Sequence, residues 1–208
     1  SLNISQRKDS KTQLSIESWI SVRLSSYLNE DERTQLISDV QRILDDVRLA
    51  AQDSQAMGQR VLEIANKLEP LQDVTLGGAE NYSGYLNSEV DPASRVASVQ
   101  EFLRWLARGN FLFMGIKERD LTGNGSEITL TDRPGAGLGI LAGENADGFK
   151  LTGRSVESAR NPQPIYITKA NSRSTVHRHE YLDYIGVRDF DAAGNVVGEY
   201  AVSYTHLR

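Results

Sequence analysis

The segment from Thr168 to Arg178 holds the residues of this 208-residue chain that are best suited to binding chemistry. It gathers several cationic side chains and a histidine into one polar stretch that contains no acid. These residues are Lys169, Arg173, His177 and Arg178. Hydroxyl and amide groups stand between them, at Asn171, Ser172, Ser174 and Thr175. Arginine and lysine bind carboxylates and phosphates by charge-assisted hydrogen bonds, so this pattern indicates a candidate site for a small anion or effector, or an interface.

The same residues also fit a purely structural corner. Ser, Thr and Asn side chains bond to neighbouring backbone groups in turns, and the Arg residues could pair with acids such as Asp183 or Glu180. Nucleic acid is a poorer fit. Three phosphate contacts would give the logarithm of the binding constant a slope of only about −3 against the logarithm of the salt concentration, which is weak for a dedicated nucleic-acid binder. The chain also carries a net charge of −5, which disfavours a phosphate backbone.

Other patterns give weak support for catalysis or for a metal. The chain has no Cys and no Gly-x-Ser-x-Gly motif, so we expect no activated nucleophile. The pair His177 and His179 lacks a third ligand at a metal-site spacing. The glycines between Gly135 and Gly139 lack the strand before and the helix after that a dinucleotide fingerprint needs, so we interpret them as a loop in close contact with strands. We therefore expect no catalytic, cofactor-binding or metal-binding residue in this chain.

Composition is that of a soluble globular protein, with 39% hydrophobic and 25% charged residues. No apolar run approaches the roughly 18 residues of a membrane span, and the first residues lack the apolar core of a secretory signal. The absence of Cys fits a reducing cytoplasm. The chain begins without Met, which suggests a fragment.

The spacing of apolar residues along the chain predicts the helices and strands that would position the basic segment. Residues 1–12 are polar, and we expect them to be loose. Alternating apolar residues predict a half-buried strand over 14–24, whose partners must lie elsewhere in this chain or, as we favour, in sequence that precedes Ser1. Apolar residues at helical spacing predict helices from 29 or 30 to 51 and from 57 to 68. Residues 71–90 have no clear period. Pro92 opens a further helix that ends at Gly109.

Strands dominate the remainder. We predict them at 111–116, 128–130, 165–169, 181–190 and 196–202, with turns at 122–126 and 191–195. The fold class is therefore α+β: an N-terminal strand and a helical pair, then a helix and a mostly antiparallel sheet. The expected segments are 1–24, the end of a truncated module; 25–70, helical; 71–90, a linker; and 91–208, an α+β domain.

Four stretches of this chain resemble one enzyme family. They are Glu17-Ser-Trp-Ile-Ser-Val22, Arg42-Ile-Leu-Asp-Asp-Val-Arg48, the run from Phe102 to Gly115, and Thr168 to Arg178 continued by Tyr181 to Arg188. Together they resemble the large NAD-specific glutamate dehydrogenases of bacteria, in the order in which that family has them. The residues from Ser203 onward depart from the family's pattern, so we expect them outside the fold and give His206 no role.

The resemblance implies a position within a longer enzyme. Such residues belong to the N-terminal, non-catalytic part of the family, beside ACT-like regulatory modules, so residues 1–24 would end one such module. The family oxidises L-glutamate with NAD to 2-oxoglutarate, ammonia and NADH, and its catalytic lysine and dinucleotide fold lie downstream. The resemblance thus implies NAD for the full-length enzyme and none for this chain, and as partners the rest of the polypeptide and further subunits of an oligomer. The basic segment adds a possible small anionic effector as a partner, while the net charge of −5 and the lack of a long apolar run argue against nucleic acid and a membrane.

Three hypotheses stay open on the sequence. The first is an inactive regulatory and assembly segment of such a dehydrogenase. The second is a stand-alone module that binds an amino acid or another small anion through the basic segment. The third is a structural spacer in which the same segment binds nothing.

Overall fold

The computed structural model describes residues 3–7, 17–68, 92–123, 127–143, 145, 147–176 and 179–206. The predicted linker over 71–90 lies outside the described residues. The chain divides into two compact units, Ser1–Gln41 and Arg42–Arg208. Each unit is described by itself below.

The first unit contains a two-stranded antiparallel pair and the start of a long helix. Strand β1 (Asn3–Arg7) pairs with β2 (Glu17–Ser21), in a register that sets Ser5 opposite Trp19. The predicted strand therefore has a partner within this chain, which was the less favoured of the two alternatives, and the expectation that residues 3–7 are loose is wrong. The prediction failed because β1 is short and polar, so it has no apolar alternation.

Helix α1 (Glu30–Gln52) begins where the sequence predicts it, at a reciprocal cap. The backbone N–H of Glu32 donates to Asn29 Oδ1 at 2.8 Å, and the N–H of Asn29 donates to Glu32 Oε2 at 2.9 Å. Two of the N–H groups that a helix start leaves without partners are thereby satisfied. The acids Glu30, Asp31 and Glu32 occupy the first turn, where the helix dipole favours negative charge.

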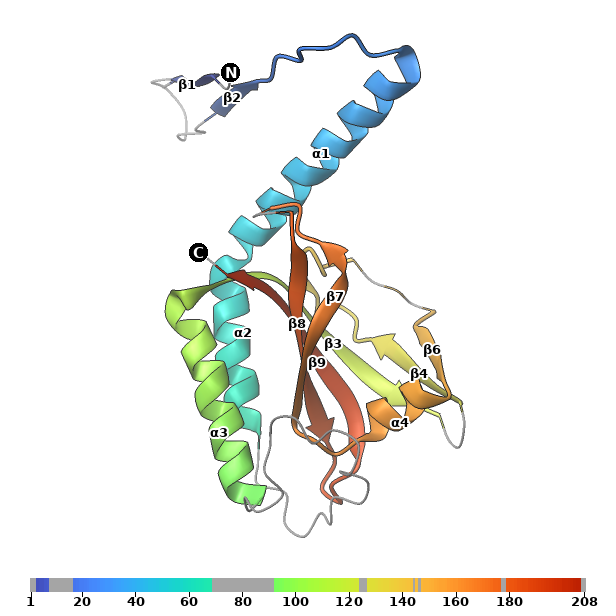
Figure 1. Cartoon of the computed structure of the whole chain (residues 1–208). Coiled ribbons are helices and arrows are strands. Elements are labelled where there is room, and N and C mark those ends of the chain that lie inside the picture. The colour runs from blue at the N-terminus through green and yellow to red at the C-terminus, as the bar shows by residue number, and fades with distance from the viewer. Residues whose placement is uncertain are drawn as a thin grey trace. The chain divides into compact units, whose positions relative to one another are not determined.

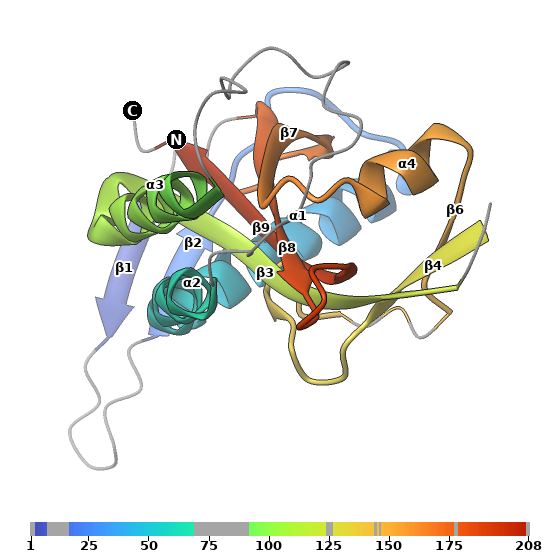
Figure 2. The ribbon, with the colours of Figure 1, turned by 90° about the horizontal axis from the view of Figure 1, so that it is seen from below.

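The second unit is a helix pair packed on one face of a sheet. Helices α2 (Ser54–Lys67) and α3 (Pro92–Trp105) lie side by side against the strands, as Figures 1 and 2 show. A turn of π-helix, η2 (Leu106–Asn110), follows α3, and Gly109 has φ +85° there, so the predicted glycine end of this helix is confirmed.

The sheet has seven strands within the described residues. They are β3 (Phe111–Thr122), β4 (Glu127–Asp132), β5 (Leu138–Gly139), β6 (Phe149–Thr152), β7 (Ile165–Arg173), β8 (Tyr181–Phe190) and β9 (Val196–His206). The order is β6-β4-β3-β9-β8-β7, every pairing between these described strands is antiparallel, and β5 pairs with β3. The short helix α4 (Arg154–Arg160) packs beside β6 and was not predicted. The α+β fold class is confirmed.

Strand β9 runs further than the sequence predicted. His206 pairs with Phe111 of β3, and Tyr204 pairs with both Phe113 and Asp183. The expectation that residues from Ser203 onward lie outside the fold is therefore wrong for 203–206. It rested on a departure from a family pattern, whereas Tyr204 packs into the same apolar core as its neighbours in β9.

The main core lies between the helix pair and the sheet. Leu103, Leu106, Ile116, Ile185 and Val202 each have an exposed fraction of 0%. From α2 it takes Met57, Val61, Ile64 and Ala65, which repeat at helical spacing. Burying a large apolar side chain contributes roughly 1.5–3 kcal/mol, so this layer dominates the stability of the unit.

Gly58 and Gly109 both have open space for a Cβ atom, but only Gly109 has a positive φ, and this difference provides a first prediction. Gly58 lies inside α2, and neither it nor Gly109 has any atom within 4 Å of where a Cβ would stand. We expect Gly58→Ala to stabilise the protein by about 0.5–1 kcal/mol, because Ala loses less backbone entropy in a helix. Gly109→Ala should destabilise it by about 1 kcal/mol, since φ +85° strains an L-residue. Urea unfolding of both variants measures the difference, and a gain in stability in both would contradict it.

Candidate functional site

The basic segment lies at the end of β7, an edge strand of the sheet, and in the turn that follows. Lys169 Nζ forms an ion pair of 2.6 Å with Asp183 Oδ1 of the neighbouring strand β8. Asn171 and Ser172 are exposed. A register shift between Lys169 and Arg173 marks an irregularity in the pairing, so the segment bends as β7 ends. One cation of the predicted site is therefore already paired with an acid of the chain.

Arg173 is the candidate anion ligand with the most open setting. Its guanidinium lies 4.9 Å from the ring centre of Tyr181, and Nη1 donates to the carbonyl oxygen of His179 at 3.4 Å. Within the described residues no carboxylate bonds to it. Arginine bound through a ring face and a carbonyl keeps most of its five N–H donors available.

The remaining residues of the segment are anchored. The backbone N–H of Ser174, which is 3% exposed, donates to the carbonyl of Glu180 at 2.8 Å. Thr175 Oγ1 donates to Asp46 Oδ2 in the last turns of α1 at 2.7 Å. His177 and Arg178 lie outside the described residues. The structure thus brings together a paired Lys169, an open Arg173 and a fixed turn, which is compatible with both the binding and the structural interpretation.

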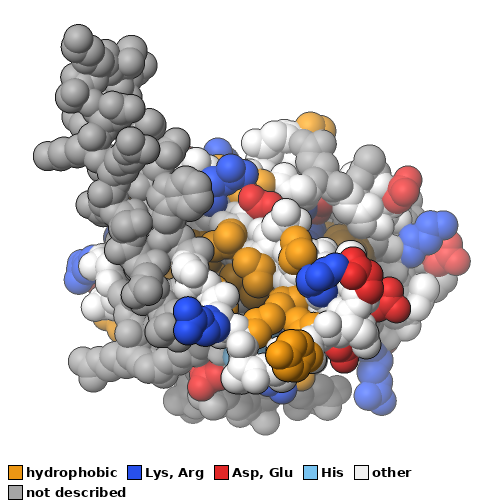
Figure 3. All heavy atoms as spheres, turned by 90° about the horizontal axis from the view of Figure 1, so that it is seen from above, with side chains coloured by type: hydrophobic (Ala, Val, Ile, Leu, Met, Phe, Trp, Pro, Cys, Tyr) orange, Lys and Arg blue, Asp and Glu red, His pale blue; other side chains and the backbone are white. Residues whose placement is uncertain are grey.

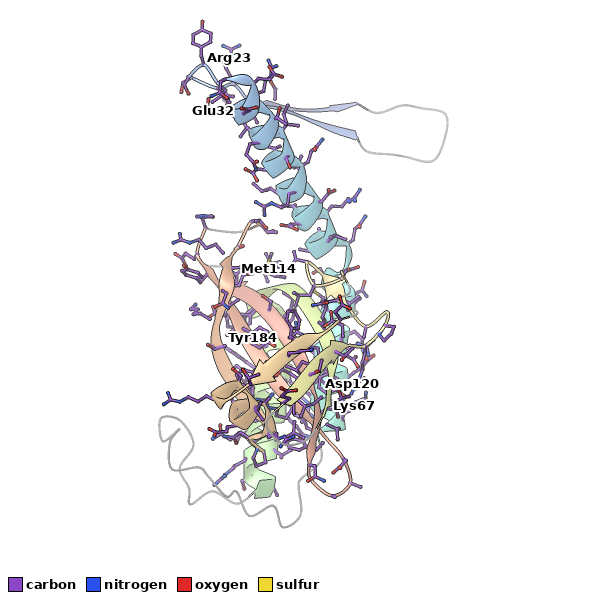
Figure 4. The ribbon with its side chains drawn as sticks, turned by 90° about the vertical axis from the view of Figure 1, so that its right-hand side faces the viewer. Arg23, Glu32, Lys67, Met114, Asp120 and Tyr184 are labelled. Carbon is purple, nitrogen blue, oxygen red and sulfur yellow. The ribbon has the colours of Figure 1, made fainter. Side chains whose placement is uncertain are left out.

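A buried group of charges, missed by the sequence analysis, lies on the sheet. Its centre is Glu199 of β9, which is 2% exposed. Glu199 accepts hydrogen bonds from Arg188 Nη1 at 2.7 Å, from Tyr166 OH at 2.8 Å and from Tyr184 OH. These residues come from β7, β8 and β9, so one carboxylate joins three neighbouring strands. Figure 4 labels Tyr184 among these strands.

The group continues along β3 and β4. Arg119 lies 3.7 Å from Glu199 and donates to Asp132 Oδ1 at 3.2 Å, while Lys117 Nζ donates to Asp132 Oδ2 at 2.8 Å. Asp132 also accepts the backbone N–H of Asn145 at 2.8 Å. A buried charge is costly unless it is paired and bonded, and each of these carboxylates meets that condition.

A second charge cluster involves the alternate residues of β3. Successive side chains of a strand point to opposite faces, so Glu118 and Asp120 lie on the other face from Lys117 and Arg119. Arg133 donates to Asp120 at 2.6 Å, to Glu118 at 3.1 Å and to Asp189 at 2.8 Å. Asp120 lies near the end of β3 (Figure 4). The sequence contains a signal for both clusters: the apolar start of β3 changes to Lys117-Glu-Arg-Asp120 within one strand.

Burial and charge set the protonation states of this network. Burial, and then the negative charge of Glu199, raise the pKa of Tyr184 well above its ordinary value and raise the pKa of Tyr166 as well. Both phenols stay protonated and act as donors. Burial opposes ionisation of Asp132, but hydrogen bonds from Lys117, Asn145 and Arg119 hold its pKa below the ordinary value. None of these groups is poised near neutral pH, so the network suits the fixing of strands better than proton transfer.

These shifts predict how stability depends on pH. The pKa of Asp132 is lower in the folded protein than in the unfolded chain, so its ionised carboxylate stabilises the fold at pH values above the unfolded-state pKa. This stabilisation is lost as the pH falls below about 4. Burial, and then the negative charge of Asp183, raise the pKa of Tyr204 to about 12. The protonated phenol therefore contributes fully to the free energy of unfolding below about pH 10, and this contribution is lost as the pH rises toward 12. Urea unfolding across this range should show both declines. Tyr204→Phe should flatten part of the alkaline decline and leave the acid one unchanged; an unaltered alkaline decline would contradict this.

The glycine loop does not fit a phosphate or a dinucleotide. A Cβ at Gly139 would lie 2.3 Å from Met114 O, and one at Gly137 would lie 2.5 Å from Leu141 O, so protein fills the space beside both residues. The N–H of Gly139 donates to Asp53 Oδ2 at 2.7 Å, which places a carboxylate where a phosphate would bind. The interpretation of these glycines as a loop in close contact with a strand agrees with β5, which pairs with β3.

Metal-binding clusters and membrane-spanning helices are both absent from the described residues. Among the described residues, no group of three or more His, Asp or Glu side chains has the arrangement of a metal site. No helix in the same part of the chain is both long and apolar enough to span a membrane.

Comparison with known proteins gives consistent matches. No family model matches the chain. It is 30% identical over 112 residues to the NAD-specific glutamate dehydrogenase of Pseudomonas aeruginosa, a match of 52% of this chain and 7% of that protein. It is 25% identical over 188 residues to the NAD-specific glutamate dehydrogenase of Halomonas elongata, which covers 88% of this chain and 11% of that protein. The chain resembles NAD-specific glutamate dehydrogenases.

The resemblance predicted from the sequence motifs is thereby confirmed. The chain spans only 7% and 11% of the length of these two glutamate dehydrogenases, which is consistent with an N-terminal region of such a large enzyme. These matches therefore do not by themselves assign the activity, ligands or assembly of a whole dehydrogenase to this chain.

Proposed function

We propose that this chain is a regulatory and assembly segment of a cytoplasmic NAD-dependent glutamate dehydrogenase and has no activity by itself. The observation that carries the proposal is the extent of the match, which covers 88% of the chain but 11% of the H. elongata enzyme. In this proposal NAD and glutamate bind elsewhere in the full-length enzyme. The partners of the segment are the rest of the polypeptide and further subunits of an oligomer.

The internal pairing of charges supports a scaffold role. Arg188, Arg119 and Lys117 are bonded to Glu199 or Asp132, and Arg133 is bonded to the acids of the second cluster. Ion pairs of this kind join neighbouring strands of the sheet, which suits a structural role.

Two measurements test this proposal. The isolated chain, mixed with L-glutamate and NAD, should produce no NADH above background at 340 nm. Deleting the region of the H. elongata enzyme that matches this chain should change its assembly state, as measured by light scattering, or its response to effectors. Turnover by the isolated chain, or a deletion that leaves assembly, kinetics and regulation unaltered, would contradict it.

A second candidate function rests on the open guanidinium of Arg173. In this proposal the segment binds an anionic effector such as an amino acid or another carboxylate, with Lys169, Arg178 and the neighbouring hydroxyl groups as further ligands. A charge-assisted hydrogen bond contributes about 1.5–3 kcal/mol, so Arg173→Ala should weaken binding by roughly tenfold or more.

Calorimetry with glutamate, 2-oxoglutarate and nucleotides measures this effect. Arg108→Ala is a matched control, because Arg108 is exposed and lies in η2, outside the segment. Arg173→Ala should weaken the binding of one ligand while Arg108→Ala does not. Absence of binding by every ligand would favour the purely structural interpretation.

A further inference from the structure

The first unit exposes apolar side chains that a stable fold would cover. None of the described side chains from 21 to 41 is buried. The exposed large ones, with their exposed fractions, are Val22 (65%), Leu24 (50%), Tyr27 (105%), Leu28 (37%), Ile37 (53%) and Val40 (40%). Exposed apolar residues are ordinary when scattered, but a contiguous group marks an interaction surface. Exposed apolar side chains are also visible on the face of the molecule in Figure 3.

The start of α1 is specified by its sequence and still lacks packing. The reciprocal cap of Asn29 and Glu32 fixes where the helix begins, and Glu32 projects from its first turns (Figure 4). Helices are marginal in water without a packed apolar face, however good their caps are. Leu36 of α1, with Leu24 and Leu28 of the preceding segment, forms an apolar face that the described residues leave at least partly exposed. A partner that covers this face would stabilise the helix.

A shallow groove shows where the partner would lie. It runs between the segment before the helix and the first turns of α1, entirely within the first unit. It is lined by the apolar side chains of Leu24, Leu28 and Leu36 and by the acidic side chains of Asp31, Glu32 and Asp39, which are together called the acidic rim.

We propose that this groove binds an amphipathic helix whose apolar stripe is bordered by Lys and Arg. The leucines supply the apolar contact of a helix-in-groove complex. The acidic rim attracts basic residues on both sides of the stripe and disfavours an acidic one. The proposal goes beyond the function proposed above, because it concerns the chemistry of the partner and holds whichever protein contains this chain.

Charge favours this partner over a second copy of the same groove. Between residues 21 and 41 the acids Glu30, Asp31, Glu32 and Asp39 outnumber the bases Arg23 and Arg33. Arg33 is already paired with Glu30. Two copies brought together through this face would place like charges opposite each other, whereas a basic helix would compensate them.

The test uses the whole 208-residue chain and two synthetic peptides. Both peptides have about three heptads with Leu at positions a and d; one carries Lys at positions e and g, and the other carries Glu there. Calorimetry and circular dichroism measure binding and the gain in helix. The Lys peptide should bind with one-to-one stoichiometry, and the Glu peptide should bind at least about tenfold more weakly.

Variants of the chain separate the groove from general attraction to an acidic protein. Leu36→Ser and, independently, Leu28→Ser should each weaken binding of the Lys peptide by about tenfold or more. Asp31→Lys combined with Asp39→Lys should reverse the preference toward the Glu peptide. Asp45→Lys is the matched control, because Asp45 is exposed further along α1 and does not line the groove, so it should leave the preference unchanged.

The possible outcomes are distinct. Selective binding that depends on Leu28, Leu36 and the acidic rim supports the proposal. Equal binding of both peptides, no binding of the Lys peptide, or binding that both leucine variants retain overturns it. Self-association of the chain that Leu36→Ser abolishes also overturns it, because a second copy would then occupy the groove.

Discussion

Glu199→Gln should destabilise the protein by about 3–5 kcal/mol, the largest effect that we expect from a single side chain. The substitution keeps the shape of the side chain and removes its charge, so Arg188, which is 4% exposed, loses its buried counterion. Since domains of this kind are stable by only about 5–15 kcal/mol, this loss is a large share of the free energy of unfolding. Urea or thermal unfolding followed by circular dichroism measures the loss.

Two further variants show whether the effect comes from the buried charge. Glu127→Gln is the matched control, because Glu127 is exposed at the start of β4, and it should change stability by less than about 0.5 kcal/mol. Adding Arg188→Met to Glu199→Gln should recover part of the loss, because it removes the charge that was left unpaired. If Glu199→Gln were as stable as the control, the network would not support the sheet in the way described.

Gly186→Ala should destabilise the protein by about 1–3 kcal/mol or more through a steric clash. A Cβ at Gly186 of β8 would lie 2.0 Å from Cε1 and 2.3 Å from Cζ of the Tyr166 ring. The ring cannot move aside freely, because Tyr166 OH donates to Glu199 at 2.8 Å and the guanidinium of Arg188 lies 4.6 Å from the ring centre. The clash therefore disturbs the buried network as well as the pairing of β7 with β8.

A double-mutant cycle with Tyr166→Ala isolates this clash. Removing the ring should make Gly186→Ala nearly harmless, so the two substitutions together should cost less than the sum of their separate effects. Gly58→Ala is the reference for an alanine introduced where space is open. Strict additivity of Gly186→Ala and Tyr166→Ala would show that the ring is not the obstacle.

The two charge clusters explain why the candidate site could be predicted only in part. The basic segment could be recognised in the sequence because its cations are close together along the chain. Asp183, which was considered as a partner of the Arg residues, pairs with Lys169 instead. Glu199, Arg119 and Tyr166 are far apart in the sequence. Only the order β3-β9-β8-β7 makes them neighbours.

The sequence by itself determined the elements with strong local signals. Helix α1 begins at its cap and α2 follows its apolar spacing, while β8 occupies the predicted residues 181–190. The turn over 191–195 is held by hydrogen bonds from Ala193 and Asn195 to the side chain of Asp191. Four motifs also indicated the resemblance to glutamate dehydrogenases. In each case the controlling interactions lie within a few residues of one another.

Tertiary structure decided the remaining features. Strand β1 exists as the partner of β2, the end of β9 is ordered by pairing with β3, and Glu199 finds its donors on two other strands. The physical reason is common to all of them: hydrogen bonds across a sheet and buried ion pairs form between residues distant in sequence, so no local pattern records them.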